Sequence, residues 1–406
     1  MTKEIIAVIV TAVAMVTSTL IFPLALKFAR KHDIVDHPNA RKLQRLPVPV
    51  FGGIVVYAGI FIGGIVLGIF MQSTILLWAI VAMTIMLMIG TWDDMKDISS
   101  VFRFLIEIAL MGAFIAITGV YVNDLHGLWG VHELNPWLGV PLSIVLGVGI
   151  INAINMIDGV DGYSSGYGIM SCALFTLAFW NVWNAKMECA VLVVMGALIP
   201  FFLHNVFGSK SKMFIGDGGT LMLGMVLVVL TFYSLWSGSN TEPLEAKGFS
   251  ITGFIIALGS IPVFDTLRVM TLRILRGTSP FKPDKTHLHH LFIDMGFSHL
   301  GAALSILAMN FMVVVIFVLS WMLGASIDVQ TYISMGLGVL VTFGFYKFMK
   351  MQQNGGPCDE EGYPQGTAFW HMMVKLGGLT HREDKRFWKV MRYLVDGPLM
   401  GGGKIG

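Results

Sequence analysis

Residues 5–28 read IIAVIVTAVAMVTSTLIFPLALKF, an apolar run in which Lys27 is the only charged residue. The apolar core of a signal peptide is about 7 to 15 residues long, whereas a helix of about 20 apolar residues spans a bilayer. We therefore expect this run to remain in the protein as a membrane-spanning helix.

The composition of the whole chain points the same way. Of the 406 residues, 55% are hydrophobic and only 13% are charged, whereas soluble proteins carry about 25% charged residues. This shortage of charge excludes a cytosolic enzyme and a nucleic-acid-binding protein. The net charge of +2 predicts neither a polyanionic partner nor an acidic tail. Three cysteines at wide, irregular spacing fit neither a disulfide framework nor a zinc site: Cys172, Cys189 and Cys358.

Further apolar stretches predict an all-α, polytopic membrane protein with about eleven transmembrane helices. We expect these helices at residues 5–29, 51–70, 74–91, 102–120, 138–156, 167–184, 187–206, 218–236, 250–275, 301–324 and 326–349.

The positive charges predict the orientation of these helices, because Lys and Arg are retained on the cytoplasmic side of a membrane. With eleven crossings, all of the 27 Lys and Arg residues except Lys3, Lys186 and Lys247 fall on one side. We therefore expect an outside N-terminus and a cytoplasmic C-terminus in the inner membrane. Most acids and histidines suited to chemistry fall on the cytoplasmic side too, whereas residues 121–137 resemble an interfacial loop on the other side.

Two adjacent carboxylates end the third predicted span, in the stretch GTWDDMKD at residues 90–97. Like charges at a membrane boundary repel each other and cost desolvation. Asp93 and Asp94 therefore need a cation, a metal or a proton-accepting role. The alternative is a solvated helix end in which both side chains face water.

A second polar stretch, NAINMIDGVDG at residues 152–162, begins inside an apolar segment. Positions three apart share a helix face, so Asn152, Asn155 and Asp158 should project together into the bundle. The glycines of the stretch allow a turn or the close approach of a ligand. A buried amide ladder between helices would explain the asparagines, but it would not explain Asp158 and Asp161.

The eighth span opens with FIGDGGT at residues 214–220. A helix that begins after a glycine-rich turn presents N–H groups to an anion. Asp217 at this position could cap the helix. It could instead hold Mg²⁺, which prefers one or two carboxylates together with phosphate oxygens.

The ninth span contains Asp265 and continues through Arg268, Arg273 and Arg276 into GTSPFKPDKTHLHH at residues 277–290. Arginines suit phosphate recognition, and histidines can donate to a phosphate or carry a proton. The histidine run could also hold zinc. We find no thiolate or fourth ligand for zinc, however, and the surrounding carboxylates favour a harder metal ion.

The cytoplasmic face thus offers carboxylates for a metal and cations for phosphates, next to lipid. This inventory favours metal-assisted phosphoryl transfer between a soluble nucleotide and a lipid. No P-loop, dinucleotide fingerprint or serine nucleophile elbow is present, and the Asp-Gly motif lacks the Ala-Arg of CDP-alcohol phosphotransferases. A secondary transporter is the alternative from another class. It would need mid-membrane polar groups and an internal repeat, but the chain has no self-similar halves.

In this order, the motifs resemble those of the polyprenyl-phosphate N-acetylhexosamine-1-phosphate transferases. The family's marks are RKLQRLPVPVFGG at residues 41–53, the Asp93-Asp94 pair, the stretches 152–162 and 214–220, and PDKTHLHH at 283–290. The chain is most similar to the bacterial branch that moves GlcNAc-1-phosphate from UDP-GlcNAc to undecaprenyl phosphate and releases UMP, the first lipid-linked step of envelope polysaccharide synthesis. Leu288 interrupts the three contiguous histidines of the related phospho-MurNAc-pentapeptide transferase, which disfavours that donor. Another UDP-N-acetylhexosamine stays open.

The resemblance implies that Asp217 binds Mg²⁺, with Mn²⁺ as the alternative, and that Asn155 is a second metal contact. Asp93 is our choice for the base that acts on the lipid phosphate, and Phe214 would stack on uracil. Whether a covalent intermediate forms is left open. The catalytic set that the resemblance implies is Asp93, Asp94, Asp158, Asp161, His287, His289 and His290. The substrate-binding set is Lys42, Arg103, Asn152, Asn155, Gly159, Val160, Phe214 and Arg276.

The chain departs from the family pattern at a few positions. Gln44 stands where a histidine is usual, and Thr220 replaces a serine but keeps the hydroxyl. Glu107 stands where a neutral polar residue is commoner, and we expect it to pair with Arg103 at i,i+4.

Two parts of the chain are expected to differ in role. Residues 1–350 should form the membrane transferase domain, and residues 351–406 a cytoplasmic tail. Within the tail, REDKRFWKVMRYLV at residues 382–395 mixes basic and aromatic residues, which suits a helix on an anionic lipid surface. A solvated tail is the alternative. Membrane lipid is thus an expected partner and nucleic acid is not, while a homodimer is left open.

Overall fold

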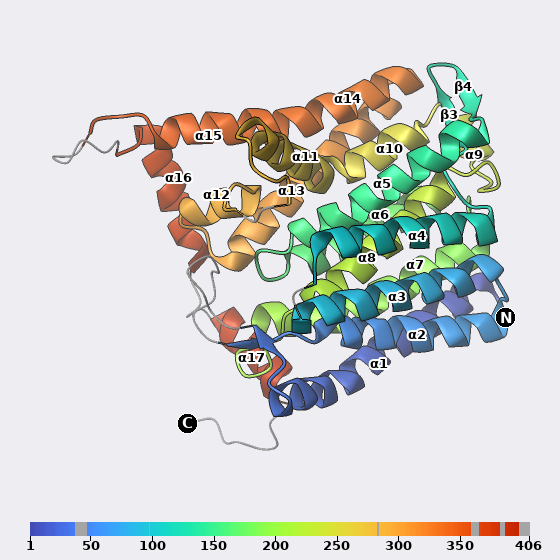
Figure 1. The fold of residues 1–406 in the computed structure, drawn as a ribbon, viewed down its shortest axis with the longest axis horizontal. Coiled ribbons are helices and arrows are strands. Elements are labelled where there is room, and N and C mark those ends of the chain that lie inside the picture. The colour runs from blue at the N-terminus through green and yellow to red at the C-terminus, as the bar shows by residue number, and fades with distance from the viewer. Residues whose placement is uncertain (37–46, 97, 282–283, 359–364, 382–385, 398–406) are drawn as a thin grey trace.

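The computed structural model describes residues 1–36, 47–96, 98–281, 284–358, 365–381 and 386–397 (Figure 1). It is a bundle of long helices with two small two-stranded sheets. The long helices are α1 (Lys3–Lys31), α2 (Gly52–Phe70), α3 (Thr74–Lys96), α4 (Ser100–Thr118), α5 (Pro136–Met156), α6 (Tyr163–Phe179), α7 (Ala185–Phe207), α8 (Gly216–Ser234), α10 (Ile251–Leu258) with α11 (Ser260–Leu275), α13 (His299–Met322), and α14 (Ile327–Val339) continued by a π-helical turn (Leu340–Gly344) into α15 (Phe345–Gln353).

Every expected membrane segment is helical in the structure. Among the described residues, nine helices are long and apolar enough to cross a membrane, and the bent pair α10 and α11 makes a tenth. The remaining expected segment, 167–184, corresponds to α6, which is 17 residues long. Helix α6 starts four residues early because Gly162, at φ +79°, lets the chain turn directly into the helix. The protein is therefore an all-α, multi-pass membrane protein.

The ninth expected span is broken rather than continuous. Helices α10 and α11 meet at Gly259 with a bend of 64°. Pro262 lacks an N–H group, so it cannot donate to the carbonyl of Leu258 in a continuous helix. That carbonyl accepts instead from Nδ2 of Asn310 and the hydroxyl of Tyr167, each at 3.0 Å. A backbone group exposed by a break inside a membrane needs such partners.

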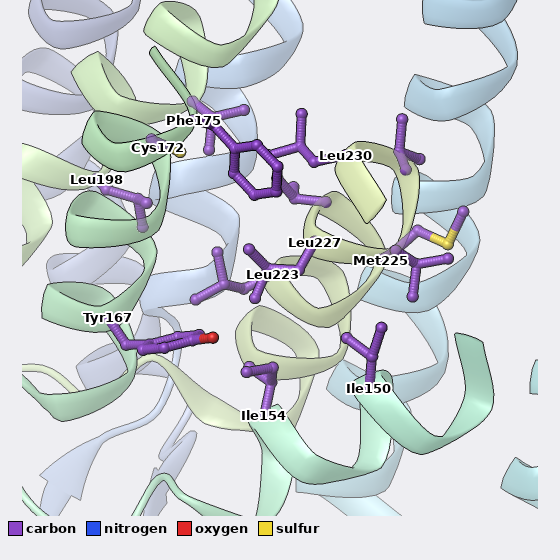
Figure 2. Close-up of a cluster of buried hydrophobic side chains, with 14 of the residues drawn as sticks. Ile150, Ile154, Tyr167, Cys172, Phe175, Leu198, Leu223, Met225, Leu227 and Leu230 are labelled. Atoms are coloured by element: carbon purple, nitrogen blue, oxygen red, sulfur yellow. The ribbon is translucent and has the colours of Figure 1, made fainter. Parts of the chain in front are cut away.

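Helix α8 is the central helix of the bundle. Its residues from Gly218 to Ser234 are all buried, and it packs against α2, α3 and α5. Figure 2 shows Leu223 and Leu227 of α8 in one apolar cluster with Ile154, Phe175 and Leu198, which come from α5, α6 and α7. This packing makes α8 a rigid support for the residues at its N-terminus.

The two ends of the bundle carry different elements (Figure 1). The N-terminus lies at the end that holds a β-hairpin of β3 (Asp124–Leu128) and β4 (Val131–Glu133) and the short helix α9 (Glu242–Glu245). The opposite end holds the strands β1 (Val35–Asp36) and β2 (Val48–Pro49) and the helices α12 (Leu288–Asp294), α16 (Ala368–Gly378), which runs into a 3₁₀ turn (Leu379–His381), and α17 (Arg386–Asp396). The end with α12 and α17 is the one that carries most of the cations.

The hairpin of β3 and β4 covers most of the segment that the sequence indicates as an interfacial loop. Trp129 and Trp137 are exposed there, as an interfacial loop requires. His126 is buried, however, and its ring nitrogens lie 2.8 Å from Oε1 of Glu245 and 2.9 Å from the carbonyl oxygen of Ser234. This histidine therefore links the hairpin to α8 and α9.

Candidate active site

A cavity of about 960 Å³ opens at the end of the bundle that holds α12. All five motifs contribute residues to its lining, the first of them through Val50. The cavity is lined by fourteen of the residues expected at the site: Asp93, Asp94, Arg103, Asn152, Asn155, Asp158, Gly159, Val160, Asp161, Phe214, Asp217, His287, His289 and His290. The structure thus brings residues from α3, α4, α5, α8 and α12, and from loops beside them, to one place.

The other two expected binding residues are Lys42 and Arg276. Lys42 lies outside the described residues. Arg276 is exposed, follows the last residue of α11 and is not among the residues that line the cavity. Arg273, one turn earlier, lines the cavity instead. Its guanidinium binds both carboxylate oxygens of Asp284 at 3.0 and 3.2 Å.

Asp217 stands in the first turn of α8, where its side chain is about 42% exposed to the cavity. Nδ2 of Asn155 donates to Oδ1 of Asp217 at 2.8 Å and to the hydroxyl of Thr220 at 2.9 Å. With its amide nitrogen on Asp217, Asn155 orients the carboxylate, and its expected role as a second metal contact stays a prediction. Oδ2 of Asp217 lies 3.9 Å from Nη1 of Arg103.

The adjacent pair Asp93 and Asp94 is separated into two different roles. Asp94 accepts hydrogen bonds from the backbone N–H groups of Asp217 at 2.9 Å and Gly218 at 3.2 Å. The carboxylate of Asp94, rather than that of Asp217, therefore caps the N-terminus of α8. Asp93 accepts from Nη1 of Arg103 at 2.8 Å and from the N–H of Ile98 at 2.9 Å. Each carboxylate has its own donors, which offsets the repulsion between the two charges.

Arg103 is the cation at the centre of this part of the site. It contacts Asp93 at 2.8 Å, Asp217 at 3.9 Å and Glu107 at 3.7 Å. The predicted i,i+4 pair of Arg103 and Glu107 is therefore confirmed. Glu107 is buried and also accepts from Nδ2 of Asn152. Three carboxylates around one guanidinium fix the position of the cation that faces the cavity.

The loop between α5 and α6 carries two carboxylates with opposite properties. Burial raises the pKa of Asp158 to about 7, although its hydrogen bond from Ser164 opposes the shift. Burial also raises the pKa of Asp161, but His299 and Lys212 outweigh that effect and lower it. Nζ of Lys212 lies 2.6 Å, and Nδ1 of His299 3.1 Å, from Oδ2 of Asp161. Asp161 is thus ionised at neutral pH, whereas Asp158 is only partly ionised.

The three histidines of the last motif lie together in the lining of the cavity. Nδ1 of His287 lies 3.0 Å from Oδ2 of Asp265, so the carboxylate holds this ring and leaves Nε2 for the cavity. The rings of His287 and His289 are stacked with centroids 5.6 Å apart. Burial lowers the pKa of His290 to about 4 and that of His289 well below its usual value, so both rings are neutral at pH 7.

A glycine is needed where these histidines meet the loop. A Cβ at Gly159 would overlap the ring of His289. The glycine in the 152–162 stretch therefore serves the close approach of a histidine from a distant motif, which explains why the two motifs occur together.

Sequence reasoning missed several residues of the site. Asp284 and Arg273 stand in or beside the last motif, so their charges were a usable signal. Lys212 and His299 have no local pattern around them, and only the fold brings them to Asp161. Asp265 was noted as a charge inside a span, which is the signal of a functional or paired residue. Arg268 donates to it at 2.7 Å.

The donor atoms at Asp217 fit a magnesium ion. Among the described residues, no group of three or more His, Cys, Asp and Glu side chains is arranged to hold a metal. Mg²⁺ is commonly bound by one or two carboxylates, with phosphate and water oxygens completing the octahedron. The exposed carboxylate oxygen of Asp217 beside a phosphate-sized space supplies that kind of partial ligand set.

Comparison with known proteins identifies the family. Residues 76–235 match the model of glycosyl transferase family 4. The chain is 31% identical over 286 residues to the undecaprenyl-phosphate alpha-N-acetylglucosaminyl 1-phosphate transferase of Escherichia coli strain K12. The matched region covers 69% of this chain and 75% of that protein. It is 28% identical over 370 residues to the probable undecaprenyl-phosphate N-acetylglucosaminyl 1-phosphate transferase of Bacillus subtilis. That matched region covers 91% of this chain and 97% of that protein. On this evidence, the chain belongs to glycosyl transferase family 4.

Proposed function

We propose that the protein transfers N-acetylglucosamine-1-phosphate from UDP-GlcNAc to undecaprenyl phosphate, giving undecaprenyl-diphospho-GlcNAc and UMP. The observation that carries the proposal is the cluster of Asp93, Arg103 and Asp217 in one cavity at the end of a membrane-spanning bundle. Such a cluster can hold a metal and a phosphate beside lipid. The printed names of the bacterial relatives support the same substrates.

The metal in this proposal is Mg²⁺, with Mn²⁺ as the alternative, held at Asp217. When bound, the ion would neutralise charge on the diphosphate and polarise its phosphorus–oxygen bonds. Asn155 keeps the Asp217 carboxylate in place through its amide nitrogen. Arg103 supplies a second, fixed positive charge for a phosphate oxygen.

The reaction proceeds by attack of a lipid phosphate oxygen on the β-phosphorus of UDP-GlcNAc. A new phosphorus–oxygen bond forms, and the bond from the β-phosphorus to the bridging oxygen breaks, so that UMP leaves with the bridging oxygen. Asp93 acts as the base that keeps the attacking oxygen unprotonated. Because a phosphate monoester is already largely ionised at pH 7, the pair of Asp93 and Arg103 contributes positioning as well.

We assign recognition of the UDP-GlcNAc donor to Phe214, residues 159–161 and the histidines of the last motif. Phe214 offers a ring for uracil. Nζ of Lys212 lies 5.9 Å from the centroid of this ring and 2.6 Å from Oδ2 of Asp161, so residues 159–161 can bind the edge of the base. His289 and His290 are neutral at pH 7, so they serve as hydrogen-bonding groups for the sugar and diphosphate, and charge neutralisation is left to Arg103 and the metal.

The substrate assignment is tested with purified protein in nanodiscs containing undecaprenyl phosphate and Mg²⁺. We expect UMP and a lipid-linked sugar with UDP-GlcNAc, and a much lower rate with UDP-MurNAc-pentapeptide. The turnover rate with UDP-GalNAc, compared with that with UDP-GlcNAc, shows whether the enzyme distinguishes the two sugar epimers. Turnover with UDP-MurNAc-pentapeptide alone would overturn the donor assignment, and turnover with none of the three would overturn the reaction.

The cavity is proposed to face the cytoplasm, with the protein in the inner membrane. The cations support this orientation, because among the described Lys and Arg residues only Lys3, Lys186 and Lys247 belong to the end of the bundle that holds the N-terminus and α9. We also propose that α17 lies on the inner lipid surface. Its side chains Phe387, Val390 and Leu394, spaced along one face, are exposed and apolar, and exposed Lys389 can meet anionic headgroups.

A native cysteine tests the orientation. Cys358 is exposed beyond α15, whereas Cys172 and Cys189 are buried. We predict that a membrane-impermeant maleimide labels the protein in permeabilised cells and leaves it unlabelled in spheroplasts with an intact inner membrane. The control is Glu133→Cys in a Cys358→Ser background, because residue 133 is exposed on the hairpin at the opposite end. Labelling of Cys358 in intact spheroplasts would reverse the assigned orientation.

A further inference from the structure

The loop between α7 and α8 is bound by a carboxylate from the distant tail helix α17. Oδ2 of Asp396 accepts from the N–H of Ser209 at 3.1 Å, from its hydroxyl at 2.8 Å and from the N–H of Lys210 at 3.3 Å. Oδ1 accepts from the N–H of Ser211 at 3.0 Å and from its hydroxyl at 2.6 Å. One side chain thus satisfies three successive backbone N–H groups, which otherwise have no helix partner.

The charge of Asp396 suits this role. Burial raises its pKa, but the hydrogen bonds from Ser211 and Ser209 outweigh the burial and lower the pKa. The carboxylate is therefore ionised at neutral pH. Hydrogen bonds to an ionised acceptor are stronger than those between neutral groups.

Apolar contacts hold α17 at this place on the bundle. The ring of Phe207, the last residue of α7, lies 5.1 Å from Trp388 and 6.0 Å from Phe387, measured between ring centroids. On the inner side of the loop, the hydroxyl of buried Ser211 lies 2.9 Å from Nδ1 of His204. The loop is therefore fixed between α7 and α17.

The same loop leads directly to the donor side of the cavity. Lys212 follows it and binds Oδ2 of Asp161 at 2.6 Å. Nδ2 of Asn205 donates to the carbonyl of Met213 at 3.0 Å, while Oδ1 of Asn205 accepts from the N–H of Gly162 at 2.7 Å. The position of residues 209–213 therefore determines where Asp161 stands and where the chain enters Phe214.

We propose that Asp396 is a positioning residue for the nucleotide donor, through which the tail helix α17 holds the loop 209–211 and so preorganises the part of the cavity formed by Asp161 and Phe214. The proposal rests on the proposed function, in which this side of the cavity binds uridine. It makes the C-terminal tail a functional part of the membrane transferase domain, rather than an appendage to it.

The kinetic test compares three full-length variants. We expect Asp396→Ala to raise the KM for UDP-GlcNAc about tenfold, because several hydrogen bonds to a charged group that preorganises the site are lost. The KM for undecaprenyl phosphate should stay within about twofold, since the acceptor groups at Asp93 and Arg103 are not touched. Asp396→Asn keeps one acceptor oxygen, so an intermediate KM is expected. Lys375→Ala, an exposed change on the other tail helix α16, should match the parent protein.

A second measurement needs no substrate. In a Cys358→Ser background, Lys210→Cys places a thiol on the loop without removing its backbone hydrogen bonds, and the other two cysteines are buried. Asp396→Ala should raise the maleimide labelling rate of this thiol several-fold, and Lys375→Ala should not. An unchanged labelling rate, or equal rises in KM for both substrates, would overturn the proposal. If the parent protein does not use UDP-GlcNAc, the labelling result still decides whether Asp396 holds the loop.

Discussion

Asp217→Asn is expected to lower kcat for sugar-1-phosphate transfer by more than about 100-fold, the upper end of the loss seen when an outer partner of a metal ligand is removed. The substitution keeps the shape of the side chain and an oxygen that can accept from Nδ2 of Asn155. It removes the negative charge that would hold the magnesium ion. The Mg²⁺ concentration for half-maximal activity should rise in any residual activity that is measured.

Two controls separate this effect from misfolding. The thermal unfolding midpoint of Asp217→Asn should equal that of the parent protein, because the packing of α8 is unchanged. Asp328→Asn alters a carboxylate that accepts from the N–H of Trp129 at the other end of the bundle, and it should leave kcat unchanged. A fully active Asp217→Asn enzyme would remove Asp217 as the metal ligand.

Gly90→Ala is expected to reduce both stability and activity, because α3 and α8 touch at this residue. A Cβ at position 90 would overlap the backbone carbonyl of Asp217, and backbone cannot rotate away as a side chain can. Forcing extra volume into a packed contact costs about 1–3 kcal/mol. The same displacement moves Asp94 away from the N–H groups of Asp217 and Gly218, so activity should fall by at least about tenfold.

The matched control is Gly112→Ala on α4, where an added Cβ meets no atom within 4 Å. It makes the same chemical change in another apolar helix and should leave the unfolding midpoint and kcat nearly unchanged. Equal behaviour of the two variants, measured by thermal unfolding in detergent and by UMP release, would contradict the close contact between α3 and α8.

The helices and most of the site could be predicted from the sequence, because their signals are local. A run such as residues 5–28 is too long for anything but a membrane span, and the polar stretch at 152–162 stands out against an apolar background. Paired acids at 93 and 94 likewise require a partner wherever they lie. Each of these inferences depends on residues that are neighbours along the chain.

The remaining features depend on contacts between distant segments. The break at Gly259 is stable because Asn310 and Tyr167 bind the exposed carbonyl of Leu258, and neither residue is near it in sequence. The resemblance implies Arg276 as a binding residue, but α11 ends before it and Arg273 lines the cavity instead.

The different roles of Asp93 and Asp94 could likewise be assigned only from the structure. Both residues have the same side chain, and only the approach of the α8 N-terminus to Asp94 and of Arg103 to Asp93 distinguishes them. The binding of the loop 209–211 by Asp396 also depends on a distant contact, since nothing around residue 396 in the sequence indicates that loop.

The most direct test of the central claim follows the β-phosphate of the donor. Purified protein is incubated with Mg²⁺, undecaprenyl phosphate and UDP-GlcNAc that carries ³²P at the β-position, and the lipid and water phases are separated. We predict that the label enters the lipid together with the sugar, and that the released nucleotide is unlabelled UMP. Label that stays in the water phase as UDP while the sugar enters the lipid would contradict sugar-1-phosphate transfer at this site.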